Sequence, residues 1–300
     1  MVFNSIFFIF CFLPVFMLIY YLVPGKLRNL LLFLGSLIFY AWGEPVYVIL
    51  MLFSSIFNYY MGTELERLYY DDRKQKINLI FSIIINLAVL VFFKYYGFLL
   101  NTIGGITGIH IPHPELSLPI GLSFYTFRNL SYLFDIYLSK VSAQRNFLTF
   151  AVYSTMFPYT SAGPIVRYTD IETQLKQRTI NISRFGIGAE LFVKGLAKKV
   201  LLADNLSVLY SSICGHPQMS VFTSWLGILA YTMQLYFDFS GYSDMAIGLG
   251  KMLGFDFNKN FDYPYISTSV SEFWRRWHIS LGSWFRDYIY IPLEIGRAHV

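Results

Sequence analysis

Long stretches without a single charged residue recur along this chain and constrain its fold more than any other feature. They cover residues 1–25, 45–63, 77–93, 95–114, 146–166 and 205–237. Several reach or exceed the roughly 20 residues that a helix needs to cross the hydrocarbon core of a bilayer. Charged residues make up 14% of the chain, against about 25% in soluble domains. So few charges do not cover a water-exposed surface, and we predict an integral membrane protein.

The composition also excludes other classes of protein. Hydrophobic residues make up 55% and aromatic residues 20% of the chain, whereas disordered chains combine low hydrophobicity with high charge. The two cysteines, Cys11 and Cys214, are too few for a disulfide framework and lack the spacing of metal ligands. The sequence has no glycine-rich phosphate loop and no nucleophile-elbow motif. We therefore predict no metal site, no bound cofactor and no nucleic-acid partner.

The apolar segments predict an all-α, polytopic protein with about 8–9 membrane segments. The expected helices cover 4–23, 28–43, 46–62, 77–98, 119–139, 147–160, 186–210 and 221–250, with a mixed segment at 266–293. Pro45 separates the second helix from the third, because proline ends a helix. The 147–160 helix is too short to span comfortably and ends at Pro158. We expect it to be kinked or re-entrant, with its free backbone groups satisfied by protein or water.

The basic residues predict an orientation in the membrane. Sixteen lysines and arginines lie in the loops 25–28, 62–76, 139–146, 163–185 and 251–277. The alternate loops, at 1–4, 43–45, 101–118 and 211–220, carry none. Since positive loops stay on the cytoplasmic side, we place the amino terminus outside and 251–277 at the cytoplasmic face. Residues 3–23 have no cleavage signal after them, so they form a retained first helix rather than a signal peptide.

Ionisable residues also lie inside or beside the apolar segments, where they are costly unless paired or functional. Arg128 and Asp135 are seven residues apart, so they share a helix face without direct contact. Glu190 and Lys194 have the spacing of a helical ion pair, for which we expect a structural role. The lysine pair at 198–199 is expected to form a solvated basic face.

The densest group of polar and aromatic residues lies at 234–290. Asp238 and Asp244 stand there in a run of aromatic, small and apolar residues. Four glycines in this run are expected to let backbones approach closely, as helix packing in lipid favours. They are Gly241, Gly248, Gly250 and Gly254.

Two tryptophans and two arginines precede His278, which is the histidine best placed for chemistry. On a continuous helix Trp274 and His278 share a face, as do Trp277 and Leu281. An imidazole of ordinary pKa is suited to proton transfer with a hydroxyl at neutral pH. A buried histidine hydrogen-bonded for structural reasons is the alternative. The other loop histidines, His110, His113 and His216, are expected to be incidental.

Several motifs together resemble one family closely. They are FDFSGYSDMAIGLGKMLGF at 237–255, NFDYPY at 260–265, EFWRRWHISLGSWFRDYIYIPL at 272–293, LPIGLSFYTF at 118–127, SYLFDIY at 131–137, AGPIVRY at 162–168 and KKVLLADN at 198–205. In these motifs the chain resembles the membrane-bound O-acyltransferases, in particular their bacterial alginate O-acetylation branch. The match extends to Leu293, and one departure is Arg128-Asn129, where the branch usually has a glutamine after SFYTF.

The resemblance implies a ring of tilted and re-entrant helices in a bacterial inner membrane. It also implies transfer of acetyl groups from a cytoplasmic thioester, such as acetyl-CoA, to the hydroxyls of an exported polysaccharide, with extracytoplasmic acetyltransferases as partners. By the same resemblance His278 is catalytic, activating a hydroxyl for attack on the acyl carbonyl. The residues predicted to support it or to bind substrate are Trp274, Arg275, Arg276, Trp277, Asp238, Tyr242 and Asp244.

The last residues depart from the resemblance. Members continue after IPL and carry a second histidine in a W-H-G context, which is usually treated as the catalytic one in the family and which residues 1–300 lack. We interpret 1–293 as an incomplete membrane domain and 294–300 as a non-native tail, because Ile-Gly-Arg-Ala-His-Val matches a translated sequencing adaptor. We expect residues 1–300 alone to be inactive. A transporter and a non-catalytic scaffold of a polysaccharide-modifying complex are the alternative functions.

Overall fold

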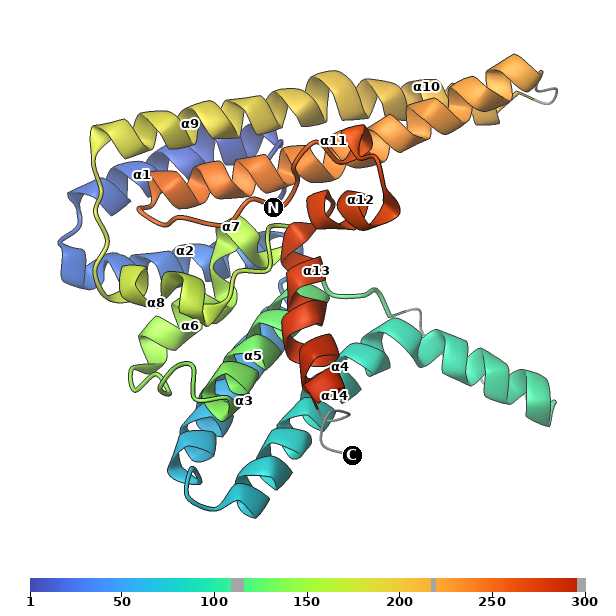
Figure 1. Ribbon diagram of the computed structural model, residues 1–300. Coiled ribbons are helices and arrows are strands. Elements are labelled where there is room, and N and C mark those ends of the chain that lie inside the picture. The colour runs from blue at the N-terminus through green and yellow to red at the C-terminus, as the bar shows by residue number, and fades with distance from the viewer. Residues whose placement is uncertain (109–115, 217–219, 296–300) are drawn as a thin grey trace. The chain divides into compact units, whose positions relative to one another are not determined.

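The computed structural model describes residues 1–108, 116–216 and 220–295. Every regular element within these ranges is helical, which confirms the all-α class (Figure 1). The chain divides into two compact units. The first unit holds Met1–Val23, Ala162–Val166 and Asp170–Val300, and the second holds Pro24–Ser161 and Arg167–Thr169. Residues 296–300 of the predicted tail lie outside the described residues, so the expected boundary at residue 293 stays a prediction. His110 and His113 also lie outside the described residues.

The second unit contains two helices that are long and apolar enough to cross a bilayer. Its helices are η2 (Gly25–Leu27), α2 (Arg28–Gly43), α3 (Val48–Arg67), α4 (Asp72–Thr107), α5 (Leu122–Tyr137), α6 (Phe147–Thr155) and α7 (Phe157–Thr160). By length and hydropathy α3 and α4 are each able to cross a bilayer. They are the two helices that pass this criterion among the described residues, so the larger number of spans stays a prediction.

Helix α4 begins five residues before the expected start. The Asp71 side chain accepts a hydrogen bond from the Lys74 backbone N–H, and so caps the amino end. Asp72 in the first turn also suits the positive end of the helix dipole. At the other end, Gly108 adopts a left-handed conformation with φ of 70°, which stops the helix there.

The short 147–160 segment is kinked, as predicted, and side chains satisfy the backbone at the kink. Met156 has ψ of 121° and separates α6 from α7. The freed Phe157 N–H donates to Ser36 Oγ at 3.0 Å. The Thr160 hydroxyl lies 2.8 Å from the Thr155 carbonyl and 2.7 Å from the Met156 carbonyl. The non-helical backbone is therefore buried in protein, which is the condition for such a break inside a membrane.

The first unit is built around one long helix. Its elements are η1 (Phe8–Phe12), α1 (Leu13–Leu22), most of α8 (Tyr168–Lys176), α9 (Ile182–Ala197), η3 (Lys198–Ala203), α10 (Asp204–Cys214), α11 (Val221–Met252), η4 (Pro264–Ile266), α12 (Val270–Arg276), α13 (Ile279–Phe285), η5 (Arg286–Tyr290) and α14 (Ile291–Ile295). The run from α9 through η3 to α10 lies alongside α11 (Figure 1). The region predicted as mixed, 266–293, indeed consists of short helical pieces.

Glycines bring α9 and α11 into backbone contact. A Cβ atom at Gly188 would lie 2.6 Å from the Gly248 carbonyl oxygen, and one at Gly195 would lie 2.5 Å from the Gly241 carbonyl oxygen. The two contacts pair increasing numbers on α9 with decreasing numbers on α11, so the helices are antiparallel. The close approach predicted for Gly241 and Gly248 is confirmed. Their partners in α9, Gly195 and Gly188, are also glycines, which allows the backbones to touch.

Candidate functional site

The helical structure is interrupted at the predicted catalytic histidine. Helix α12 ends at Arg276, Trp277 is extended with φ of −100° and ψ of 127°, and His278 is left-handed with φ of 44° and ψ of 54°. The Asp262 N–H donates to the Arg276 carbonyl at 2.9 Å, and the Ile279 N–H donates to the Asn260 carbonyl at 2.9 Å. These bonds hold residues 276–279 against the preceding loop. The prediction that Trp274 and His278 share the face of one helix is therefore wrong.

His278 lies half-buried among aromatic side chains. Its ring is perpendicular to Phe239 of α11, with 4.8 Å between centroids, and stacks at 6.4 Å on Phe261. Its Nδ1 atom is 3.2 Å from Oδ1 of Asn260. Burial lowers the pKa of His278 to about 4, and a hydrogen bond with its own backbone carbonyl offsets only part of this effect. The pKa is therefore not the ordinary value of an imidazole. Burial disfavours the charged form, so the imidazole is neutral at pH 7.

The side chains just before His278 have different roles. Trp277 stacks on Phe273 at 5.6 Å and meets Phe261 edge-on at 5.1 Å. It therefore belongs to the aromatic group around His278, which also contains Phe239 and Phe261. Trp274 is 61% exposed, and Arg275 is exposed as well. Of these three side chains, Trp277 is the one that packs against Phe261, which in turn stacks on His278.

Arg276 holds the loop in place. Its guanidinium pairs with Glu272, with Nε at 3.0 Å and Nη2 at 2.9 Å from one carboxylate oxygen. It also donates to the Asp262 carbonyl at 3.2 Å. The pKa of Glu272 is lowered by hydrogen bonds from the Thr268 backbone and hydroxyl, and then by Arg276. The Glu272 carboxylate is therefore charged at neutral pH, and its contacts with Arg276 hold that side chain on the loop.

The acidic residues of α11 pair with the lysines of η3. Lys198 Nζ is 2.6 Å from Asp244, and Lys199 Nζ is 2.7 Å from Asp238 and 2.9 Å from Asp204. The prediction that 198–199 forms a solvated basic face is wrong, because the π-helical turn of η3 places both lysines against acidic partners. The third predicted residue of α11, Tyr242, stacks on Phe3 with 4.6 Å between ring centroids.

A recess adjoins the aromatic group and has a volume of about 660 Å³, which is within the range of small-molecule sites. We call it the lysine recess. Among its lining residues are Lys194, Lys198, Lys259, Asp244, Tyr236 and Phe261. Phe261 also stacks on His278, so one wall of the recess is a packing partner of the histidine. Lys194 and Lys259 also pair with Glu190 and Asp262, in side chains that are largely exposed. The predicted ion pair of Glu190 and Lys194 is thereby confirmed.

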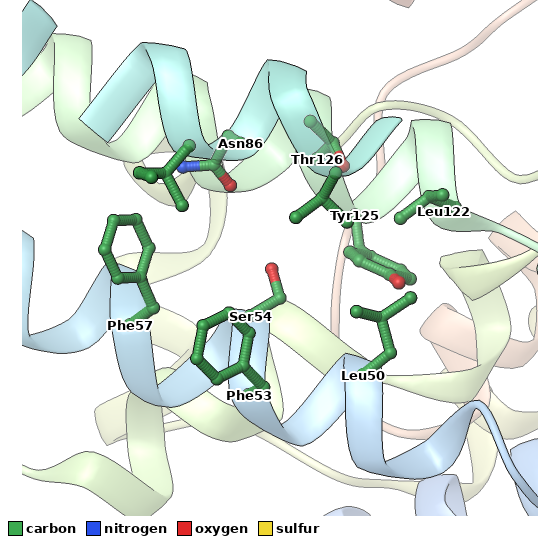
Figure 2. A pocket seen from close by; sticks show the side chains of 10 residues that line it. Leu50, Phe53, Ser54, Phe57, Asn86, Leu122, Tyr125 and Thr126 are labelled. Atoms are coloured by element: carbon green, nitrogen blue, oxygen red, sulfur yellow. The ribbon is translucent and has the colours of Figure 1, made fainter. Parts of the chain in front are cut away.

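The second unit holds a polar cluster that the sequence did not indicate. Asn58 and Asn86 exchange hydrogen bonds of 3.0 and 2.9 Å between α3 and α4. Asn129 of α5 donates to Ser54 Oγ at 3.1 Å and accepts from Ser154 Oγ at 3.0 Å. Figure 2 shows Ser54 and Asn86 pointing into the narrow space between these helices. Such bonds hold helices together in lipid.

Arg128 and Asp135 act separately in this unit. Arg128 is fully buried and donates to the carbonyls of Tyr159 at 2.7 Å and Ser154 at 2.9 Å, beside the α6–α7 kink. Its guanidinium lies 4.4 Å from the centroid of the Tyr159 ring. Asp135 is 3.7 Å from Lys140 Nζ. The two residues thus have different partners, and both stabilise local structure.

The sequence matches the model of the membrane-bound O-acyltransferase family over residues 42–299. With its all-helical fold, its apolar helices and the His278 loop, the chain belongs to this family of membrane proteins. Over 99% of its length it is 44% identical to a protein of Pseudomonas aeruginosa named "Probable alginate O-acetylase AlgI". It is 34% identical over 99% of its length to the "Peptidoglycan O-acetyltransferase" of Helicobacter pylori. A "Teichoic acid D-alanyltransferase" of Bacillus subtilis is 28% identical over 61% of the chain.

The chain spans only part of these relatives. It covers 58% of the Pseudomonas protein, 63% of the Helicobacter protein and 47% of the Bacillus protein. The matches to the Pseudomonas and Helicobacter proteins cover 99% of this chain and so include His278 and the lysine recess.

The sequence missed two close neighbours of His278. Asn260 and Phe239 lie 18 and 39 residues before it in the chain, and both contact its ring. Asn260 opens the NFDYPY motif, and Phe239 lies in the glycine-rich run of α11. Each motif was visible in the sequence, but the contact between them arises only when the chain folds back.

Proposed function

We propose that the full-length protein is a membrane-bound O-acetyltransferase that acetylates hydroxyls of an exported polysaccharide. The observation that carries this proposal is the loop at His278, where a neutral imidazole is held among Phe239, Phe261 and Asn260. A neutral imidazole accepts a proton, whereas a charged one does not. The names of the relatives, two of which are O-acetylating proteins, support the same reaction class.

The reaction needs one base at the acceptor hydroxyl. His278 takes the hydroxyl proton while the oxygen attacks the carbonyl carbon of the thioester. The C–S bond then breaks, the thiolate leaves, and the proton passes from the imidazolium to the sulfur. The products are an ester and a free thiol. Donors placed around the carbonyl oxygen would stabilise the charge that develops there.

We propose an acyl thioester, such as acetyl-CoA, as the donor. The lysine recess supports this assignment by its volume and by its three lysines, which suit the phosphates of such a carrier. The pairs that Lys194 and Lys259 make are exposed. Exposed pairs of this kind contribute little free energy, so both ammonium groups are free to turn toward a phosphate.

We also propose a location for the protein and its partners. The charge distribution of the loops favours a multi-pass protein of the bacterial inner membrane, with its amino terminus outside. The acceptor then lies on the extracytoplasmic side, with polysaccharide-modifying acetyltransferases there as partners. The names of the relatives leave the acceptor polymer open among alginate, peptidoglycan and similar glycans.

The test is acetylation of the exported polymer in cells that carry the full-length protein with His278→Gln. We expect acetylation to fall at least 100-fold, as is typical for loss of a general base, at equal protein level in the membrane. His216→Gln is the matched control, because His216 is exposed in the loop after α10, and it should act like wild type. Normal acetylation with His278→Gln would contradict the proposal and favour a scaffold. Substrate flux without any acyl transfer would favour a transporter.

A further inference from the structure

Asn260 is a buried polar side chain that contacts the His278 ring. It is only 1% exposed and lies in the loop between α11 and η4. Its Oδ1 atom is 3.2 Å from the Ser280 backbone N–H, 2.9 Å from Ser280 Oγ and 3.2 Å from His278 Nδ1. One side-chain oxygen therefore faces three groups of the 278–280 turn.

The backbone settles which amide atom of Asn260 faces the turn. The Ser280 N–H is a donor and has no acceptor capacity. Rotating the amide by half a turn would place the Asn260 NH₂ group against this N–H, so two donors would meet. The atom in that position is therefore the oxygen, which only accepts hydrogen bonds.

The same oxygen determines the tautomer of the imidazole. A neutral histidine carries one hydrogen, on Nδ1 or on Nε2. Nδ1 lies 3.2 Å from the acceptor oxygen of Asn260. With an acceptor on this side, the hydrogen belongs on Nδ1, and the lone pair of Nε2 stays available.

We propose that Asn260 is a positioning residue that holds His278 as the Nδ1–H tautomer and so leaves Nε2 to accept the proton of the substrate hydroxyl. This inference rests on the proposed function of His278. The main chain of Asn260 contributes as well, because its carbonyl accepts the Ile279 N–H at 2.9 Å. Both the backbone and the side chain of Asn260 thus support the left-handed conformation of His278.

Three substitutions separate positioning from folding. Asn260→Leu removes the acceptor. Asn260→Asp keeps an acceptor and loses no hydrogen bond from Nδ2, which has no partner among the described residues. Ser280→Ala is the matched control, because it removes the hydroxyl bonds to Asn260 and to the Ile165 N–H but leaves Oδ1 opposite Nδ1.

The direct experiment is ¹⁵N NMR of histidine-labelled full-length protein in lipid nanodiscs, with His278→Gln to assign the signal. We expect Nε2 of His278 to be unprotonated at pH 7 in wild type and in Ser280→Ala. In Asn260→Leu we expect a substantial fraction of the Nε2–H form. A wild-type Nε2–H tautomer would overturn the inference, and so would an unchanged Nδ1–H tautomer in a folded Asn260→Leu protein.

A pH profile of acetyl transfer gives a second readout. Among the described residues, Asn260, Phe239 and Phe261 contact the ring, and none of these three side chains titrates. An Asp at 260 adds a negative charge that raises the pKa of the imidazole, typically by 1–3 units. With a rise of about 2 units, Asn260→Asp loses about twofold of its activity between pH 8 and pH 6, and Ser280→Ala follows wild type. A flat Asn260→Asp profile over this range, together with an unchanged Nδ1–H tautomer in Asn260→Leu, would contradict the inference.

The two proposals fail separately. The NMR signal reports the tautomer without any need for activity. Acetylation by His278→Gln reports whether the histidine acts in the reaction, whatever its tautomer.

Discussion

The glycine contact between α9 and α11 gives a prediction whose size follows from the structure. Gly188 faces Gly248, and a Cβ atom at position 188 would lie 2.6 Å from the Gly248 carbonyl oxygen and 2.8 Å from the Met252 backbone nitrogen. Both neighbours are backbone atoms, so neither moves unless the helices separate. We therefore expect Gly188→Ala to push the two helices apart.

The expected free-energy change is the difference of two effects. Overpacking costs about 1–3 kcal/mol, and alanine gains about 1 kcal/mol of helix propensity over glycine. The net loss for Gly188→Ala is then up to about 2 kcal/mol. Gly186 lies on the same helix, and a Cβ there would meet nothing within 4 Å. Gly186→Ala should consequently stabilise by up to about 1 kcal/mol.

The assay is thermal unfolding of the two purified variants in the same detergent, followed by the fraction that stays soluble and monodisperse. We expect the midpoint to fall for Gly188→Ala and to rise or stay level for Gly186→Ala. Equal midpoints for the two variants would refute the reasoning, because propensity would then account for both changes without any helix contact.

Three further predictions concern charged groups. Lys198→Glu should destabilise the first unit, and adding Asp244→Lys should restore part of the loss, with a coupling of about 0.5–3 kcal/mol in a double-mutant cycle. Arg128→Met should lower stability by at least ~2 kcal/mol in thermal unfolding, because two buried carbonyls lose their donor. Burial raises the pKa of Asp256, but hydrogen bonds from Arg184 and Lys251 hold it below its usual value. The stabilisation it provides is then present at neutral pH and lost as pH falls through this lowered pKa. Asp256→Asn should therefore lower stability in unfolding scans at pH 7 and leave it unchanged in scans at acid pH.

Much of the helix pattern was predictable from the sequence, because hydrophobic segments and their end signals are local. The expected 28–43 helix matches α2, and the expected 221–250 helix matches α11 within two residues. Ser220 caps α11 by accepting from the Thr223 N–H, which is a signal within four residues. Such local features do not depend on the rest of the chain.

The break at His278 was not predictable in the same way. The spacing of Trp274 and His278 predicted a shared face on a continuous helix, yet hydrogen bonds to Asn260 and Asp262 replace the helical ones. Nothing within the segment itself signals this, because the partners lie 14 and 19 residues earlier in the chain. The pairing of Lys198 with Asp244 across 46 residues has the same origin. The geometry of the site depends on contacts between segments that are distant in the chain. The sequence alone therefore indicates which residues form the site, but not which of them contact one another.

The central claim is that His278 acts in acetyl transfer, and reconstitution tests it most directly. The full-length protein is placed in liposomes with a labelled acetyl thioester and a polymer acceptor, and ester formation is measured in a single turnover. We predict transfer by wild type and by His216→Gln, and at least a 100-fold slower rate for His278→Gln. Transfer by His278→Gln at the wild-type rate would contradict the account.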